Sequence, residues 1–76
     1  MENKKVLIID DDEKLNRLLT EYLSRYGFRI DSATSPSAAF AYIDRKPADI
    51  IILDIMLPEM DGFEVCKRIR AGHDIP

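Results

Sequence analysis

Aspartates that directly follow apolar runs are the residues in this sequence best suited to chemistry. Asp10, Asp11 and Asp12 follow one such run, and Asp54 follows another. Like charges held close together repel unless a cation lies among them. Carboxylate and carbonyl oxygens are the ligands that Mg²⁺ prefers, and this ion often brings phosphate oxygens with it. An aspartate at the edge of such a site can act as a nucleophile toward phosphorus and form an aspartyl phosphate.

Helix capping is the alternative role for these carboxylates. Asp12 stands where the N-cap of a following helix belongs, and a single strand-end aspartate commonly caps a helix. Three consecutive acids cannot all cap one helix, and capping does not account for Asp54. On the residues alone, capping and ligand roles both stay open, and convergence of the two strand ends would favour the ligand role.

Three strands are predicted from the apolar patterning. Residues 6–9 and 50–53 are continuous, mostly β-branched runs, which is typical of strands buried on both faces. Residues 28–33 alternate, with Phe28, Ile30 and Ser32 on one face, and this strand is the expected edge.

Three helical patterns separate and follow these strands. The first carries an apolar stripe and ends at Gly27 as a C-cap. The second begins with Ser35 as N-cap and Pro36 at the first helical position. The third ends at Gly72. The three expected stripes are Leu15, Leu18, Leu19, Tyr22, Leu23 and Tyr26; then Ala39, Phe40 and Ile43; then Phe63, Cys66 and Ile69.

The resulting βαβαβα order predicts an α/β fold with a parallel sheet and right-handed crossovers. In open sheets of this kind, ligands bind outside the carboxyl ends of the strands, where chain order reverses. If the first and third strands are neighbours, about 4.8 Å apart, their acids meet at that point.

The two acidic motifs together resemble a receiver domain of a two-component response regulator. The motifs are Val-Leu-Ile-Ile-Asp-Asp-Asp at residues 6–12 and Ile-Ile-Ile-Leu-Asp-Ile-Met-Leu-Pro-Glu-Met-Asp-Gly at residues 50–62, and the resemblance extends over residues 5–76. It implies a flavodoxin-like parallel sheet of strand order 2-1-3. Receiver domains are themselves an example of proteins with the flavodoxin-like strand order.

The resemblance also implies roles for particular residues. Asp54 would be the phosphoacceptor, and Asp10, Asp11 and Asp54 would hold Mg²⁺ together with the backbone carbonyl of Met56. Pro58 and Gly62 would shape the loop after the acceptor. The phosphoryl donor would be a phosphohistidine on a sensor histidine kinase, or a small acyl phosphate.

The chain departs from the family in length, because an intact receiver has five βα units and residues 1–76 supply three. A hydroxyl residue on strand four and a lysine on strand five are therefore absent, and that lysine stabilises charge on the phosphoryl group. Lys5 cannot replace it, since it lies about 17 Å from the acidic end of its strand. We expect phosphorylation to be impaired by the truncation. We do not expect the chain to be an enzyme that acts on a separate substrate.

The truncation also predicts a homodimer. The outer edge of the third strand would present unpaired backbone groups, which template another strand. Without a fifth helix, part of the stripe of Leu15, Leu19 and Leu23 would be bare. Pairing of two third strands across a two-fold axis would cover the edge and give a six-stranded sheet.

Two other functions compete with a signalling module. A structural half-receiver that self-associates without signalling is the main alternative. A phosphatase of the haloacid dehalogenase type needs an Asp-x-Asp motif with a threonine two residues on. Asp10 and Asp12 meet the first condition, but Lys14 stands at the threonine position.

Composition excludes several other classes of protein. With 46% hydrophobic and 33% charged residues, the chain fits a soluble globular domain. The single Cys66 allows no internal disulfide and favours the cytoplasm. The net charge of −3 argues against nucleic-acid binding. No apolar stretch approaches the roughly 20 residues of a membrane helix.

Overall fold

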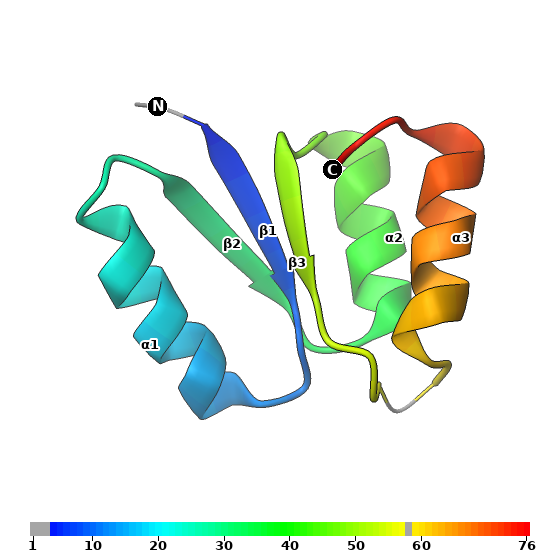
Figure 1. Cartoon of the computed structure of the whole chain (residues 1–76), viewed down its shortest axis with the longest axis horizontal. Coiled ribbons are helices and arrows are strands. Elements are labelled where there is room, and N and C mark those ends of the chain that lie inside the picture. The colour runs from blue at the N-terminus through cyan, green and yellow to red at the C-terminus, as the bar shows by residue number, and fades with distance from the viewer. Residues whose placement is uncertain (1–3, 58) are drawn as a thin grey trace.

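Strands and helices alternate along the chain as predicted. The computed structural model describes residues 4–57 and 59–76. Its elements are β1 (Lys5–Ile9), α1 (Glu13–Ser24), β2 (Arg29–Ala33), α2 (Pro36–Arg45), β3 (Ile50–Leu53) and α3 (Gly62–Gly72). The strands form a parallel sheet in the order β2-β1-β3 (Figure 1), which is the predicted flavodoxin-like order.

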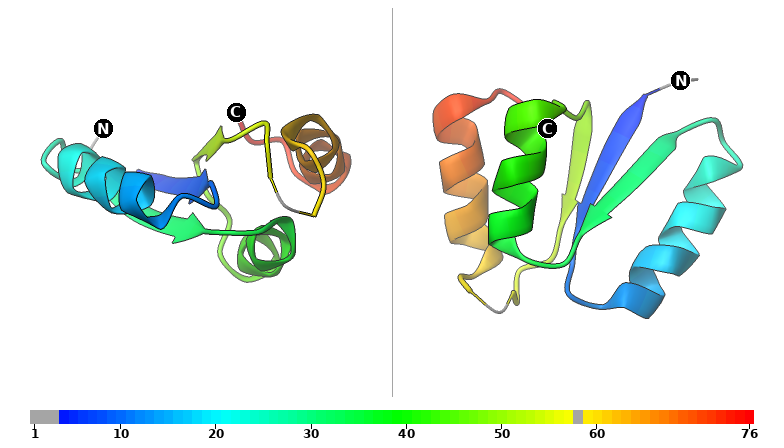
Figure 2. Two further views of the ribbon diagram at one scale, coloured as in Figure 1. Left: turned by 90° about the horizontal axis from the view of Figure 1, so that it is seen from below. Right: turned by 180° about the vertical axis from the view of Figure 1, so that it is seen from behind.

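The sheet separates α1 from the other two helices, which lie together on its opposite side (Figures 1 and 2). The central strand β1 is buried from Val6 to Ile9 because it has a strand on each edge and helices over both faces of the sheet. Leu7 and Ile9 belong to one core cluster with residues of α2 and α3. The main core cluster contains Leu7, Ile9, Ala33, Ala39, Ile43, Ala48, Val65 and Ile69. The core of the fold therefore fixes β1 and β3, whose ends carry the candidate site.

The register of the strands brings their carboxyl ends level. Ile9 of β1 is paired with Leu53 of β3 and with Ala33 of β2. The residue after β3 and the residue after β1 continue the ladder. The Asp54 N–H donates to the Ile9 carbonyl at 2.9 Å, and the Asp10 N–H donates to the Ala33 carbonyl at 3.1 Å. Asp10 and Asp54 thus leave the sheet side by side.

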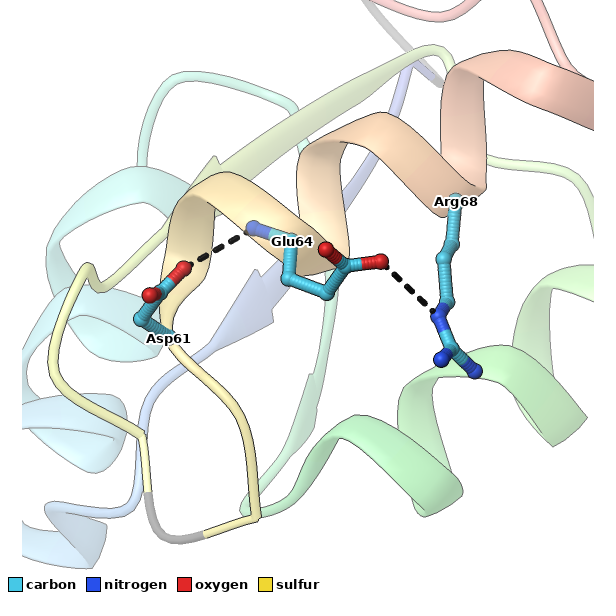
Figure 3. Close-up of polar contacts among 3 residues, drawn as sticks. All are labelled: Asp61, Glu64 and Arg68. Atoms are coloured by element: carbon cyan, nitrogen blue, oxygen red, sulfur yellow. Dashed lines mark hydrogen bonds and ion pairs between the residues drawn. The ribbon is translucent and has the colours of Figure 1, made fainter.

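Each helix begins with a side-chain cap; the caps at Asp12 and Ser35 were expected from the sequence, and the cap at Asp61 was not. Asp12 accepts from the Leu15 N–H, and Ser35 accepts from the Ala38 N–H ahead of α2. Asp61 accepts from the Glu64 N–H at 2.9 Å, and the Glu64 carboxylate points along α3 to Arg68 at 3.2 Å (Figure 3). These caps satisfy N–H groups that a helix start leaves unpaired.

The buried face of α1 differs from the predicted stripe. Leu19 and Leu23 are half-buried, but Leu15, Leu18, Tyr22 and Tyr26 are exposed. The apolar stripe is wider than the face that touches the sheet, and the fully buried position on α1 belongs to Asn16. The helix ends at Ser24, so Gly27 is not its immediate C-cap; with a φ of 87°, it closes the turn that follows.

The prediction for α3 was wrong at Phe63. This side chain is 71% exposed, whereas Val65 and Ile69 are buried and Cys66 is half-buried. Residues four apart share a helix face, but Phe63 is two residues from Val65 and so points roughly 200° away. The pair Val65 and Ile69 therefore defines the core face of the helix.

The outer edge of β3 was predicted to be unpaired, and this is wrong at one position. The Ile51 N–H donates to the Pro76 carbonyl at 2.9 Å, and Ile75 packs against the core cluster. In Figure 1 the C-terminus lies beside the start of β3. Alternate N–H groups of a strand point to the same edge, so the Leu53 N–H faces that edge as well.

Among the described residues, none of the helices has the length and apolar character needed to cross a bilayer. The predicted shaping role of Pro58 lies outside the described residues.

Candidate functional site

Three carboxylates meet at the carboxyl ends of β1 and β3. Asp10, Asp11 and Asp54 each offer an oxygen, and these three oxygens all lie within 4.8 Å of one another. Asp10 and Asp54 are half-buried and Asp11 is exposed. A set made only of hard oxygen donors fits Mg²⁺, which keeps several waters and uses one or two carboxylates. The geometry therefore suits a magnesium ion that remains open to a phosphate oxygen.

Asp10 is held by hydrogen bonds at three places. Its N–H is used in the sheet, as described above. Its Oδ1 accepts from the Asp12 N–H at 2.9 Å, and its backbone carbonyl accepts from the Asn16 Nδ2 at 2.9 Å. Its second carboxylate oxygen accepts no hydrogen bond from the residues that the structure describes, so it is left for a ligand. Asn16 was not singled out from the sequence, because it falls between apolar positions of α1 and resembles a surface residue there.

Asp54 is positioned by the backbone on both sides. Its N–H belongs to the β3–β1 ladder, and its Oδ1 accepts from the Met56 N–H at 3.2 Å. The Met56 side chain is 82% exposed. Met56 therefore touches the acceptor through its main chain.

Gly62 allows the loop after Asp54 to return close to its own start. The Gly62 N–H donates to the Ile55 carbonyl at 2.6 Å. A Cβ on residue 62 would lie 2.5 Å from the Asp54 carbonyl oxygen and 2.6 Å from the Ile55 Cα, and both of these are backbone atoms. A side chain at this position would have to push the backbone of the acceptor aside.

Glu59 ties the same loop to the start of α2. Its Oε1 accepts from the Ser37 N–H at 2.9 Å and from the Ser37 hydroxyl at 2.7 Å, and its Oε2 lies 2.9 Å from that hydroxyl. The hydroxyl bond, followed by the backbone bond, lowers the pKa of Glu59 below its ordinary value of 4.5. The tether is therefore a contact of the ionised carboxylate.

We expect Ser37→Ala to raise the pKa of Glu59 part of the way back, because the backbone N–H bond remains. A depressed folded pKa means that the tether stabilises the fold above the unfolded pKa and loses this effect as pH falls through the folded pKa. A carbon-13 NMR titration of the Glu59 carboxyl measures the change. An unaltered Glu59 pKa in the variant would show that Ser37 does not hold this loop.

Two tyrosines with raised pKa values lie outside the site. Burial, and then the hydrogen bond to Asp31, raises the pKa of Tyr42 to about 12. The hydrogen bond with Tyr22, and then burial, raises the pKa of Tyr26. Neither of the two contacts the acidic cluster, so both shifts reflect local packing.

Lys5 is placed away from the acids. It begins β1, and its backbone N–H donates to Asp49 Oδ2 at 2.8 Å, at the opposite end of the strand from Asp10. Lys5 therefore cannot reach a phosphoryl group at Asp54, as expected from the sequence.

The family profile of the response regulator receiver domain matches residues 6–76. This chain belongs to the receiver domain family. Among curated relatives of this receiver, sensory transduction protein RegX3 of Mycobacterium tuberculosis is 45% identical over 71 residues, which are 93% of this chain and 31% of the relative. The alkaline phosphatase synthesis transcriptional regulatory protein PhoP of Bacillus subtilis is 41% identical over 68 residues, 90% of this chain and 28% of the relative.

Solved receiver structures share the fold. A two-component response regulator from Clostridium difficile superimposes with a TM-score of 0.94 at 35% identity, over 97% of this chain and 61% of that one. Response regulator TrrA from Thermotoga maritima, solved in complex with Mg²⁺ and BeF, gives a TM-score of 0.84 at 35% identity, over 90% of this chain and 59% of that one. The receiver chain described here thus spans about a third of its curated relatives and about three fifths of these solved chains.

Proposed function

We propose that this receiver accepts a phosphoryl group on Asp54 from the phosphohistidine of a sensor histidine kinase, in a Mg²⁺-dependent reaction. The observation that carries the proposal is the meeting of Asp10, Asp11 and Asp54 at the ends of two adjacent parallel strands. Membership of the receiver family supports the same role. The protein acts in this account as a phosphoacceptor in signalling, located in the cytoplasm, and not as an enzyme with a separate substrate.

The transfer forms one bond and breaks another. An Asp54 carboxylate oxygen attacks the phosphorus, the bond from phosphorus to the donor histidine nitrogen breaks, and that nitrogen keeps the electron pair and takes up a proton. The Met56 N–H holds Asp54 Oδ1, which leaves Oδ2 to make the attack. The β3–β1 ladder holds the Asp54 backbone still, so that the carboxylate is presented in a fixed direction.

Asp10 and Asp11, with Asp54 and the Met56 carbonyl, would hold the ion. When bound, Mg²⁺ offsets the negative charge of the carboxylates and of the incoming phosphoryl oxygens. The fit is supported by the all-oxygen donor set and by the free second oxygen of Asp10. The solved complex of TrrA with Mg²⁺ and BeF is consistent with this assignment.

Magnesium binding tests the proposal before any phosphoryl donor is added. We expect Mg²⁺ to shift the amide NMR signals of residues 10, 11 and 54 more than signals elsewhere. Asp11→Asn should weaken binding by at least the roughly 10–100-fold that the loss of an outer-shell partner costs. Asp12→Asn is the matched control, since it removes the same charge at the adjacent residue and keeps a good N-cap. Equal affinities in the two variants would contradict direct ligation by Asp11.

Self-association is a second candidate property, favoured by exposed apolar side chains. Leu18 of α1 is 63% exposed and Ile52 of β3 is 40% exposed. Burying one such side chain contributes roughly 1.5–3 kcal/mol. We propose that a polypeptide of residues 1–76 forms a homodimer through the β3 edge beyond Ile51, where the Leu53 N–H faces outward.

Sedimentation at micromolar concentration tests the dimer. We expect Ile52→Lys to give a folded monomer, because a charged side chain, lysine especially, on an edge strand opposes pairing with another strand. Ala41→Lys, on the exposed outer surface of α2, adds the same charge and should leave the dimer intact. A folded, concentration-independent monomer of the unmodified polypeptide would refute this property and leave the phosphoacceptor proposal untouched.

A further inference from the structure

Asn16 is the polar residue with the deepest burial among the described residues, at 3% exposed. It lies in the first turns of α1, where its N–H donates to the Asp12 carbonyl at 3.0 Å. Asparagine is a weaker helix former than leucine, and burying an amide costs stability unless it is fully hydrogen-bonded. A leucine would continue the stripe of Leu19 and Leu23 at this position, so neither helix formation nor packing explains the asparagine.

The hydrogen bonding of Asn16 is incomplete in a particular way. Its Nδ2 donates to the Asp10 carbonyl at 2.9 Å, but its Oδ1 is buried and accepts no hydrogen bond from the described residues. The residue borders a cleft of about 280 Å³ between α1 and the end of β2, which Thr20 and Thr34 also line. An unsatisfied buried acceptor destabilises a fold. The single bond that Asn16 makes is therefore the feature that needs a reason.

That bond falls where the sheet stops holding the chain. The Ile9 carbonyl, the last of β1, still accepts from the Asp54 N–H. The Asp10 carbonyl is the next one along and is bonded by Asn16. A peptide unit is planar, so fixing the Asp10 oxygen also fixes the Asp11 N–H and the direction in which the Asp11 chain continues. Because the Asp12 N–H also holds Oδ1 of Asp10, the directions of the Asp10 and Asp11 side chains are then both set.

We propose that Asn16 is a positioning residue of the acidic site: its amide locks the Asp10–Asp11 peptide and so sets the spacing of the carboxylates around Mg²⁺. The metal part of this inference rests on the proposed function. The locked peptide does not, because it exists without the ion. Asn16 does not touch the ion or the phosphoryl group in this account.

Asn16→Leu separates positioning from stability. It has the same number of side-chain heavy atoms, removes the donor and also removes the unsatisfied acceptor. We expect the urea midpoint measured in EDTA to stay about the same, because removing the buried Asn16 Oδ1 offsets the loss of the donor to the part-buried Asp10 carbonyl. The Mg²⁺ affinity should fall at least about tenfold, as for other outer-shell partners. In the metal-free protein, the carbonyl carbon-13 shift of Asp10 and the nitrogen-15 shift of Asp11 should change, and relaxation should show a looser Asp11 amide.

Thr20→Val is the matched control. Thr20 lies on the same face and lines the same cleft, but its hydroxyl donates to the Asn16 backbone carbonyl at 2.7 Å and bonds to no carboxylate of the described residues. We expect its Mg²⁺ affinity and its Asp10 and Asp11 shifts to match those of the unmodified chain. Asn16→Ala provides a second variant without the donor if the Asn16→Leu chain does not fold. Alanine is smaller than asparagine, so it cannot overfill the site, and it favours the helix.

The outcomes separate this inference from the function on which it rests. Unchanged Mg²⁺ affinity in both Asn16 variants, in a chain that binds the ion, would overturn the positioning role. If the unmodified chain binds no Mg²⁺, the metal proposal fails, and the inference is then decided by the metal-free signals. If the Asp11 amide stays rigid and its NMR shift stays unchanged in the Asn16 variants, the inference is overturned. If the shift changes and the amide becomes more mobile, the part of the inference that concerns the locked peptide is supported.

Discussion

Asp54→Asn is expected to abolish the addition of a phosphoryl group from acetyl phosphate in the presence of Mg²⁺. The amide nitrogen and oxygen of asparagine are poor nucleophiles, and a neutral side chain also weakens the acidic site. The fold should persist, because the Asp54 backbone N–H, which bonds to the Ile9 carbonyl, is unchanged. Intact mass spectrometry should show one added phosphoryl group in the unmodified chain and none in the variant.

Asp61→Asn is the control for this experiment. Asp61 caps α3 through a bond to the Glu64 N–H and is not one of the three clustered carboxylates. Asparagine caps a helix about as well as aspartate, so this variant should be modified like the unmodified chain. Equal modification of all three proteins would mean that the phosphoryl group resides elsewhere.

The rate of this reaction is expected to be low in a polypeptide limited to residues 1–76. From the resemblance to receiver domains we expect a lysine and a hydroxyl residue on later strands, and Lys5 lies at the far end of β1 from the acids. The absence of one preorganised charge-stabilising group costs about 10²–10³ in rate. A chimera that continues after residue 76 with the matching part of the Clostridium difficile regulator should regain this factor.

Replacing the lysine that we expect on strand five of that chimera with alanine should remove the gain. Both polypeptides carry the same Asp10, Asp11 and Asp54, so differences between them report the added groups. Acetyl phosphate and quench-flow mass measurement give the rates. A rate for residues 1–76 within a few-fold of the chimera would show that the three carboxylates and Mg²⁺ suffice.

The part of the structure that local patterns control could be predicted from the sequence. Continuous apolar runs predicted the positions of β1 and β3, and Asp12 and Ser35 each cap a helix as expected. The expected burial of β3 on both faces was wrong, because β3 is an edge strand here and Ile52 is exposed. The strand order came from family resemblance. Once it was assumed, parallel pairing placed the two acidic strand ends together.

The features that the sequence did not reveal depend on contacts between distant segments. Asn16 is polar, and nothing local shows that α1 turns it toward the Asp10 carbonyl. The contact of Ser37 with Glu59 joins residues 22 positions apart. The bond from the Ile51 N–H to the Pro76 carbonyl depends on how the segment after α3 runs beside β3.

Helix faces were predicted too broadly for a related reason. An apolar stripe shows which side of a helix can be buried, but the width of the buried part depends on the neighbouring element. On α1 the sheet covers Leu19 and Leu23 and leaves Leu18 and Tyr22 exposed. On α3 the four-residue spacing of Val65 and Ile69 determines the face, and the large Phe63 remains outside it.

Direct location of the phosphoryl group tests the central claim. After treatment with acetyl phosphate and Mg²⁺, borohydride reduces an aspartyl phosphate to homoserine, and peptide sequencing by mass spectrometry finds the altered residue. We predict homoserine at position 54, dependent on both Mg²⁺ and the phosphoryl donor. Homoserine at Asp10, Asp11 or any other aspartate, with Asp54 unaltered, would contradict it.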